Sequence, residues 1–187
     1  MLLLGGCAAV KPAEQPITLR LVPAAPPPLP SLLPAALAVA PVQARGLAGA
    51  LRYDYVDASA PAEIRQAKTL FWEEPPTRVV EHALVGALRS RFATVTGPEL
   101  GQPSARRVVV ELDRFEETGA GGAARATVAF AVSVSGTNLL TGGYCASAPI
   151  DGASGTARAR AFEAAIGAAT IAFAQDMASG RLSTLGC

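Results

Sequence analysis

The chain has 187 residues, a net charge of +1 and 50% hydrophobic residues. This length suits a single domain with a short tail and is sufficient to bury a sizeable core. The near-neutral charge lacks the excess of Lys and Arg that marks a nucleic-acid-binding surface, so no nucleic-acid partner is expected. No run of about 20 consecutive apolar residues is present, so no membrane-spanning helix is expected.

The first residues resemble the cleavage site of a bacterial lipoprotein. In Leu4-Gly5-Gly6-Cys7 two small residues precede a cysteine, whose thiol takes up a diacylglyceryl group in such proteins. We therefore predict Cys7 as the lipidation site and residues 1–7 as the remnant of a signal peptide. The segment before Cys7 is shorter than a secretory h-region of roughly 7–15 apolar residues, so an unmodified terminus is the alternative.

The residue after Cys7 bears on the location. Ala8 stands where an Asp would retain a lipoprotein in the inner membrane. We therefore expect the chain to be lipid-anchored on the periplasmic face of the outer membrane. Residues 8–16 form the expected tether, which reaches less than about 30 Å when extended.

Residues 17–187 are expected to form one domain. An alternating strand at 17–21 precedes a Pro-rich loop at 22–35, since proline suits neither a helix interior nor a central strand. Further strands are predicted at 37–40 and at 51–56.

The next stretch combines a strand, a helix and a second strand. Residues 63–72 have charges at alternating positions, which predicts an edge strand with one wet face. Pro75-Pro76 begins an amphipathic helix over 77–91, because the first helical position tolerates a residue without an N–H group. A short strand at 92–96 follows.

A long hairpin is the clearest pattern. One set of residues alternates inward, while Glu111, Asp113 and the alternate residues from Thr127 to Ser133 point outward. The inward set is Val108, Val110, Leu112, Val128, Phe130, Val132 and Val134. The turn falls at Gly119–Gly122, which leads into a strand and so is not a phosphate-binding loop.

A short strand through Cys145, bracketed by Asn138 and Gly142-Gly143, and a final helix over 156–178 complete the domain. The helix carries a regular apolar stripe made of Phe162, Ile166, Ala169, Phe173 and Met177. The expected fold class is α+β, with a mainly antiparallel sheet and two amphipathic helices packed on one face.

The two remaining cysteines suggest a disulfide. With Cys7 set aside, Cys145 and Cys187 form an even pair in a chain bound for an oxidising compartment. We predict that they are bridged. Two free thiols are the alternative, because a sequence does not determine the Cα separation that a bridge requires.

Catalytic and metal-binding patterns are missing from the sequence. His82 is the single histidine, and its pairing with Cys145 would lack a third, orienting group. Neither G-x-S-x-G nor H-E-x-x-H occurs. We therefore expect no enzyme activity, no metal site and no cofactor.

Three aromatic residues are candidates for a functional or a structural role. Trp72, the single tryptophan, either anchors a partner or fills the corner between the strand at 63–72 and the helix at 77–91. Its position just before the prolines favours the structural alternative. Tyr53 and Tyr55 are predicted to lie on one face of their strand and share the same two alternatives.

The stretch from Leu51 to Val95 resembles the ABC-type transport auxiliary lipoproteins, the family of the paraquat-inducible protein C lipoproteins. The features that carry the resemblance are a tyrosine-bearing strand, Glu63-Ile64-Arg65, Trp72 with Pro76, the helix from Val80 to Leu88, and Phe92-Ala93-Thr94-Val95. The later strand, hairpin and helix follow in the family's order, so the resemblance covers nearly all of the mature chain.

The resemblance implies an auxiliary role in lipid transport between the two membranes. Its expected partners are a periplasmic mammalian-cell-entry (MCE) protein and an inner-membrane ABC permease and ATPase, which it would dock at the outer membrane. Two other classes are open: an anchored activator of a cell-wall synthase, and a structural or assembly lipoprotein of the envelope. A homo-oligomer is also open.

Overall fold

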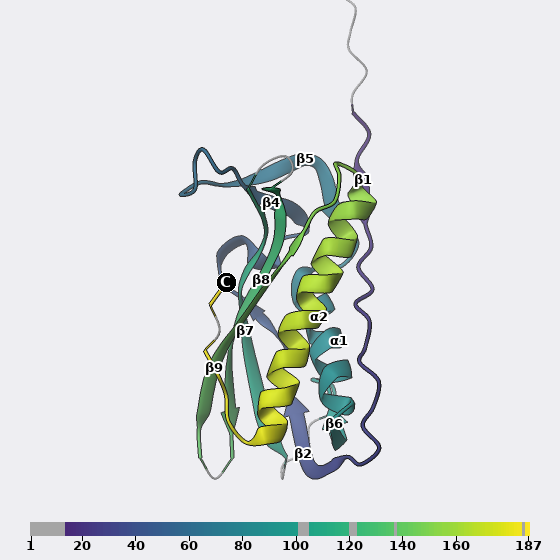
Figure 1. Cartoon of the computed structure of the whole chain (residues 1–187), viewed down its shortest axis with the longest axis vertical. Helices are drawn as coiled ribbons and strands as arrows, with labels where there is room; N and C mark the ends of the chain where they lie inside the picture. Colours follow the sequence, from purple (N-terminus) through teal and green to yellow (C-terminus); the bar gives the residue numbers. More distant parts are fainter. Residues whose placement is uncertain (1–13, 101–104, 120–122, 137, 185) are drawn as a thin grey trace, which may run out of the picture.

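The computed structural model describes residues 14–100, 105–119, 123–136, 138–184 and 186–187. In these residues a nine-stranded mixed sheet carries two helices on one face (Figure 1). The elements in chain order are β1 (Ile17–Leu19), β2 (Leu33–Val39), β3 (Gln43–Ala44), a 3₁₀ turn (Gly46–Gly49), β4 (Arg52–Val56), β5 (Ile64–Trp72), α1 (Pro76–Arg89), β6 (Phe92–Thr96), β7 (Arg106–Thr118), β8 (Arg125–Ser135), β9 (Leu140–Pro149) and α2 (Gly155–Ser179).

The longest strand, β7, organises the sheet. β8 pairs antiparallel along one of its edges, and β9 pairs antiparallel with β8. On the other edge β2, β3 and β4 each pair in parallel with successive parts of β7. The chain breaks between these short strands because Pro41 cannot donate a ladder hydrogen bond and because Gly46 turns it at φ +58°.

The remaining strands extend the two ends of this edge. β5 pairs antiparallel with β4 and in parallel with β1, while β6 pairs in parallel with β2. The α+β class is confirmed. The two longest ladders, β7 with β8 and β8 with β9, are antiparallel, whereas the five parallel ladders are short.

Both helices begin and end at residues that suit these positions. Pro76 is the first residue of α1, and the Ser154 side chain accepts a hydrogen bond from Ala157 N at 3.1 Å to cap α2. Gly180 ends α2 in the left-handed conformation at φ +76°. The predicted stripe of α2 is buried as a whole, from Phe162 to Met177.

Several strands differ from the sequence predictions, beginning with β1, which ends at Leu19 instead of residue 21. β2 begins at Leu33, inside the predicted loop, because a bulge between Leu33 and Ala36 accommodates Pro34. β5 is an edge strand only in its first half, since β1 pairs with Leu70–Trp72. β9 runs through Gly142-Gly143 instead of stopping there.

The Pro-rich segment forms a strap along the helices. Residues 20–32 lie in one extended run beside α1 and α2 (Figure 1). Val22 N donates to Glu163 Oε1 on α2 at 2.8 Å, and Leu29 N donates to the Ser90 carbonyl at the end of α1 at 3.0 Å. The strap therefore runs along the helices and is bonded to both of them.

The molecule has two distinct ends. At the N-terminal end, β1 lies beside the start of α2. A Cβ atom added to Gly155, the first residue of α2, would be only 3.9 Å from Ile17 Cγ2. At the opposite end, which we call the distal end, α1 and α2 finish and β2, β6 and β7 begin (Figure 1). Neither of the two described helices combines the length and the apolarity needed to cross a bilayer.

Candidate functional site

An aromatic cluster joins both halves of the sheet to α2. It consists of Tyr53 on β4, Trp72 on β5, Phe115 on β7 and Phe162 on α2. The Trp72 ring centroid lies 5.0 Å from that of Tyr53, 5.3 Å from Phe115 and 4.9 Å from Phe162. Such edge-to-face contacts stabilise a core beyond the area that they bury.

The structure therefore brings two of the three predicted aromatic residues into contact. Trp72 is 3% exposed, which places its indole in the interior and gives a partner no surface to contact. Tyr53 is buried beside it, and Tyr55 is half-buried and packs against the core. The geometry thus supports the prediction that Trp72 fills the corner between its strand and the following helix.

A polar network caps the aromatic cluster. Tyr53 Oη donates to Glu117 Oε2 at 2.5 Å, and Arg158 Nε on α2 donates to the same oxygen at 2.9 Å. Burial, reinforced by the bond to Glu117, raises the pKa of Tyr53 well above its usual value. Glu117 and Arg158 were not predicted, because a single acid and a single arginine far apart in the sequence carry no recognisable pattern.

The face of the sheet without helices carries the disulfide. Cys145 and Cys187 are bonded, with their Cα atoms 5.2 Å apart. Tyr144, the neighbour of Cys145 on β9, contacts Phe173 of α2, so strand alternation turns Cys145 to the opposite face. A Cys145 nucleophile would need a free thiol, whereas in the structure its sulfur is bonded to that of Cys187.

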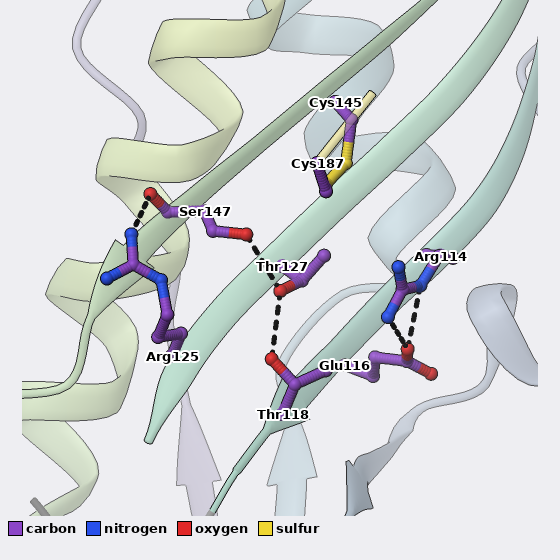
Figure 2. The surroundings of a disulfide bond; sticks show 8 residues. All are labelled: Arg114, Glu116, Thr118, Arg125, Thr127, Cys145, Ser147 and Cys187. Carbon is purple, nitrogen blue, oxygen red and sulfur yellow. Dashed lines mark hydrogen bonds and ion pairs between the residues drawn. A yellow bond between two sulfur atoms is a disulfide. The ribbon is translucent and has the colours of Figure 1, made fainter. Parts of the chain in front are cut away.

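Polar side chains surround the disulfide in Figure 2. Thr127 Oγ1 lies 3.2 Å from Thr118 Oγ1 and 3.0 Å from Ser147 Oγ, so one hydrogen-bonded row crosses three strands. Thr127, predicted to point toward solvent, is only 2% exposed. Glu116 on the same face is also buried and pairs with Arg114.

The C-terminal tail is held along β9. After Gly180 the tail reverses direction, and Gly143 N donates to the Ser183 carbonyl at 3.0 Å. Asp176 Oδ2 accepts from Tyr144 Oη at 3.0 Å and from Ser183 N at 3.1 Å. The tail therefore pairs with the edge of β9 at one point before Cys187 reaches Cys145.

A bulge in β7 falls at Asp113, the last residue of the predicted alternation on this strand. Asp113 is the extra residue between Leu112 and Arg114, and its Oδ1 lies 3.5 Å from Arg45 Nε. After the bulge Phe115 faces the helices. The predicted alternation therefore holds on β7 only up to Leu112, because a bulge changes the face of every residue that follows it.

Open hollows lie along the helices. An open hollow of about 410 Å³ lies between the outer side of α1 and residues 97–100, and His82, Arg78 and Arg89 line it. Among the described residues, no group of three or more His, Cys, Asp and Glu side chains is placed to hold a metal ion. Cys7 lies outside the described residues.

Comparison with known proteins identifies the family. The chain superimposes on the crystal structure of protein XCC0632 from Xanthomonas campestris, described with the DUF330 family, with a TM-score of 0.73 and 18% identity over 84% of this chain and 92% of that one. A second crystal structure, of an uncharacterized protein, gives a TM-score of 0.68 and 13% identity over 88% of this chain and 99% of that one. At these identities the two structures show a shared fold.

No significant match occurs among the curated proteins. One family model does match, that of the ABC-type transport auxiliary lipoprotein component. It matches residues 18–174, which run from β1 through most of α2. This match includes the aromatic cluster and both partners of the polar network. The chain belongs to the ABC-type transport auxiliary lipoprotein component family.

Proposed function

We propose that the chain is a non-catalytic outer-membrane lipoprotein that docks an MCE/ABC-type lipid transporter at that membrane. The observation that carries this proposal is the family match over residues 18–174, which includes nearly the whole described domain. The family description supplies the association with an ABC transporter and the lipoprotein character. The lipid cargo, the MCE partner and the outer membrane belong to the proposal.

The N-terminal part of the chain supports an anchored arrangement. Cys7 would carry the lipid, and residues 8–16 would hold the domain within about 30 Å of the membrane, because an extended proline-containing segment advances about 3.1 Å per residue. The described domain begins only at the end of this tether, where β1 starts at Ile17.

Co-purification with a periplasmic MCE protein tests the transporter role. The full-length chain, expressed in its own organism with a C-terminal tag attached through a flexible linker, is expected to retain the MCE protein after solubilisation in mild detergent. An abundant lipoprotein expressed with the same tag provides the control. Recovery of neither the MCE protein nor an ABC permease above this control would contradict the proposal.

The main alternative is an activator of a cell-wall synthase or an assembly lipoprotein. Such an activator generally needs a long tether to reach the cell wall, whereas residues 8–16 are few. Co-purification of a peptidoglycan synthase in place of the MCE protein would favour this alternative.

A further inference from the structure

The charges of the molecule are distributed unevenly between its two ends. Six arginines form all seven ion pairs of the described residues: Arg20, Arg45, Arg65, Arg78, Arg114 and Arg158. None of these six belongs to the distal end. The seven acids in these pairs also lie outside the distal end, so the net charge of +1 does not describe the local charge there.

Besides Arg89, which ends α1 and donates to the Val95 carbonyl oxygen, four arginines without an ion pair among the described residues lie at the distal end. Arg91 joins α1 to β6, Arg106 and Arg107 begin β7, and Arg181 follows the last turn of α2. These segments meet at one end of the molecule in Figure 1. The carboxylate on the last turn of α2, Asp176, is already bonded to Tyr144 and Ser183.

Exposed leucines accompany these arginines. Leu139 in the β8–β9 turn is 69% exposed, and Leu29, Leu32 and Leu33 are between 38% and 40% exposed. Leu29 and Leu33 are held at the end of α1 by hydrogen bonds from their N–H groups to Ser90 and Arg91. We define the four arginines and these four leucines as the distal surface.

We propose that the distal surface binds an acidic, partly apolar segment of the periplasmic partner protein. The arginines supply the charge complementarity, and the exposed leucines supply apolar area at the same end. The inference rests on the proposed function for the identity of the partner, and it adds the contact surface and the chemistry of the segment.

The dimensions of the chain favour a protein partner over the anchoring membrane. The 25 residues of α2 run from the N-terminal end to the distal end, a length of about 37 Å. Extended at about 3.1 Å per residue, the ten steps from Cys7 to Ile17 reach about 31 Å. If Cys7 is anchored, the tether is too short for the molecule to stand inverted with its distal end on the same membrane.

Charge reversal tests the surface. We compare the double variant Arg107→Glu/Arg181→Glu with a matched control, Arg52→Glu/Arg160→Glu, in the full-length chain in detergent. All four arginines are exposed and lack an ion pair among the described residues, so both variants change the charge equally. The probe is the purified periplasmic domain of the MCE protein from the same organism.

We expect three results if the distal surface binds the MCE domain. The distal variant should bind the MCE domain at least tenfold more weakly, while the control changes less than twofold. Binding of the unaltered chain should weaken between 50 and 300 mM salt, because exposed charges are screened. A photo-crosslinking residue in place of exposed Ser135 should attach to a segment rich in Asp and Glu.

Other outcomes would overturn the proposal in separate ways. Equal binding by both variants would show that the distal surface is not the binding site for the MCE domain. The proposed function would then still stand. Absence of binding by the unaltered chain would overturn the proposed function and this inference together. Weaker binding of the distal variant to phosphatidylglycerol–phosphatidylcholine vesicles, with unchanged MCE binding, would reassign the surface to a membrane.

Discussion

Large aromatic side chains stabilise the point where three parts of the chain meet. Trp72 ends β5, Phe115 follows the bulge of β7, and Phe162 lies on α2, yet their rings pack in direct contact. Tyr53 adds a hydroxyl group, which donates a hydrogen bond to Glu117. Arg158 donates to the same carboxylate. A chain with only 5% aromatic residues thus concentrates four of them in one place.

Replacement of Trp72 by Ala should lower the free energy of unfolding by about 3–5 kcal/mol, because it leaves a cavity among three rings. Urea denaturation of the two proteins measures this difference. Phe71→Ala provides the neighbouring control: Phe71 is half-buried and lies next to Trp72 on β5, so its loss should be smaller. Unchanged stability together with lost binding of the MCE protein would make Trp72 an interface residue instead.

Alkaline pH should destabilise the protein partly through Tyr144. Burial, together with the bond to Asp176, raises the pKa of Tyr144 to about 12, compared with about 10 in an unfolded chain. Between pH 10 and 12 the unfolded chain loses this proton while the folded chain retains it, so the free energy of unfolding falls as pH rises.

The variant Tyr144→Phe should therefore lose less stability than the unaltered chain between pH 10 and 12. Chemical denaturation at several pH values measures the slope. Tyr55→Phe, at a half-buried tyrosine outside the Tyr144–Asp176 node, is the control. An identical alkaline slope in Tyr144→Phe and the unaltered chain would contradict the assignment.

At the scale of elements, the C-terminal tail covers part of the sheet edge at β9. Unpaired strand edges invite pairing with other chains, and proteins commonly cover or shorten them. Here Ser183 bonds to Gly143, Thr184 bridges to the same residue, and Cys187 is bonded to Cys145 on the helix-free face. Backbone pairing and a covalent bond act on one short segment.

Gly142→Ala should loosen the tail. A Cβ atom at this position would lie 2.6 Å from the Ser183 carbonyl oxygen and 2.9 Å from Leu182 Cβ, so the tail must move. We expect a loss of about 1–3 kcal/mol in stability and faster hydrogen exchange at Gly143 N. Gly143→Ala is the matched control, because its Cβ would meet Thr184 Cγ2 at an ordinary 3.7 Å. Similar exchange rates in both variants would contradict the tail contact.

The disulfide should contribute substantially to stability. It closes a loop with a sequence separation of 42 residues, for which the chain-entropy model gives about 4 kcal/mol. Non-reducing peptide mapping should recover Cys145 and Cys187 in one linked peptide pair, and Cys187→Ser should lower the unfolding midpoint. Free alkylation of both thiols in the native protein would exclude the bridge.

At the scale of the whole molecule, the long axis separates the expected anchor from the distal surface. The chain emerges beside the first turn of α2, and the C-terminal ends of both helices lie at the far end (Figure 1). If Cys7 carries the proposed anchor, a short tether at this end would leave the opposite end available to the proposed periplasmic partner. This arrangement connects the lipoprotein character of the family with a docking role.

Anchoring through Cys7 predicts the behaviour of one variant. Expressed from its natural start, the protein should partition with outer membranes, and Cys7→Ser should release it into the periplasmic fraction. Membrane fractionation with an immunoblot measures the distribution. Ala8→Ser, beside the same cysteine, is the control and should remain bound. A Cys7→Ser protein that stays in the membrane fraction would contradict the anchor.

Local patterns were sufficient for much of the fold. The period-two alternation of β7 and β8 and the apolar stripe of α2 predicted their elements because each strand or helix buries one face. Pro75-Pro76 likewise located the start of α1. The order of motifs from Tyr53 to Val95 indicated the family, which the match over residues 18–174 confirms.

Long-range pairing could only be decided by the tertiary structure. The parallel alignment of β2, β3 and β4 along β7, the bulge at Asp113 and the β1 pairing of β5 join residues far apart in sequence, where no local period records the register. The same holds for Glu117 with Arg158, and for the gathering at one end of arginines that have no ion pair among the described residues. Sequence by itself determined the main regular elements, the apolar stripes that they bury and the family of the chain. The packing of those elements determined which polar and charged groups meet, because such groups interact through distance in space.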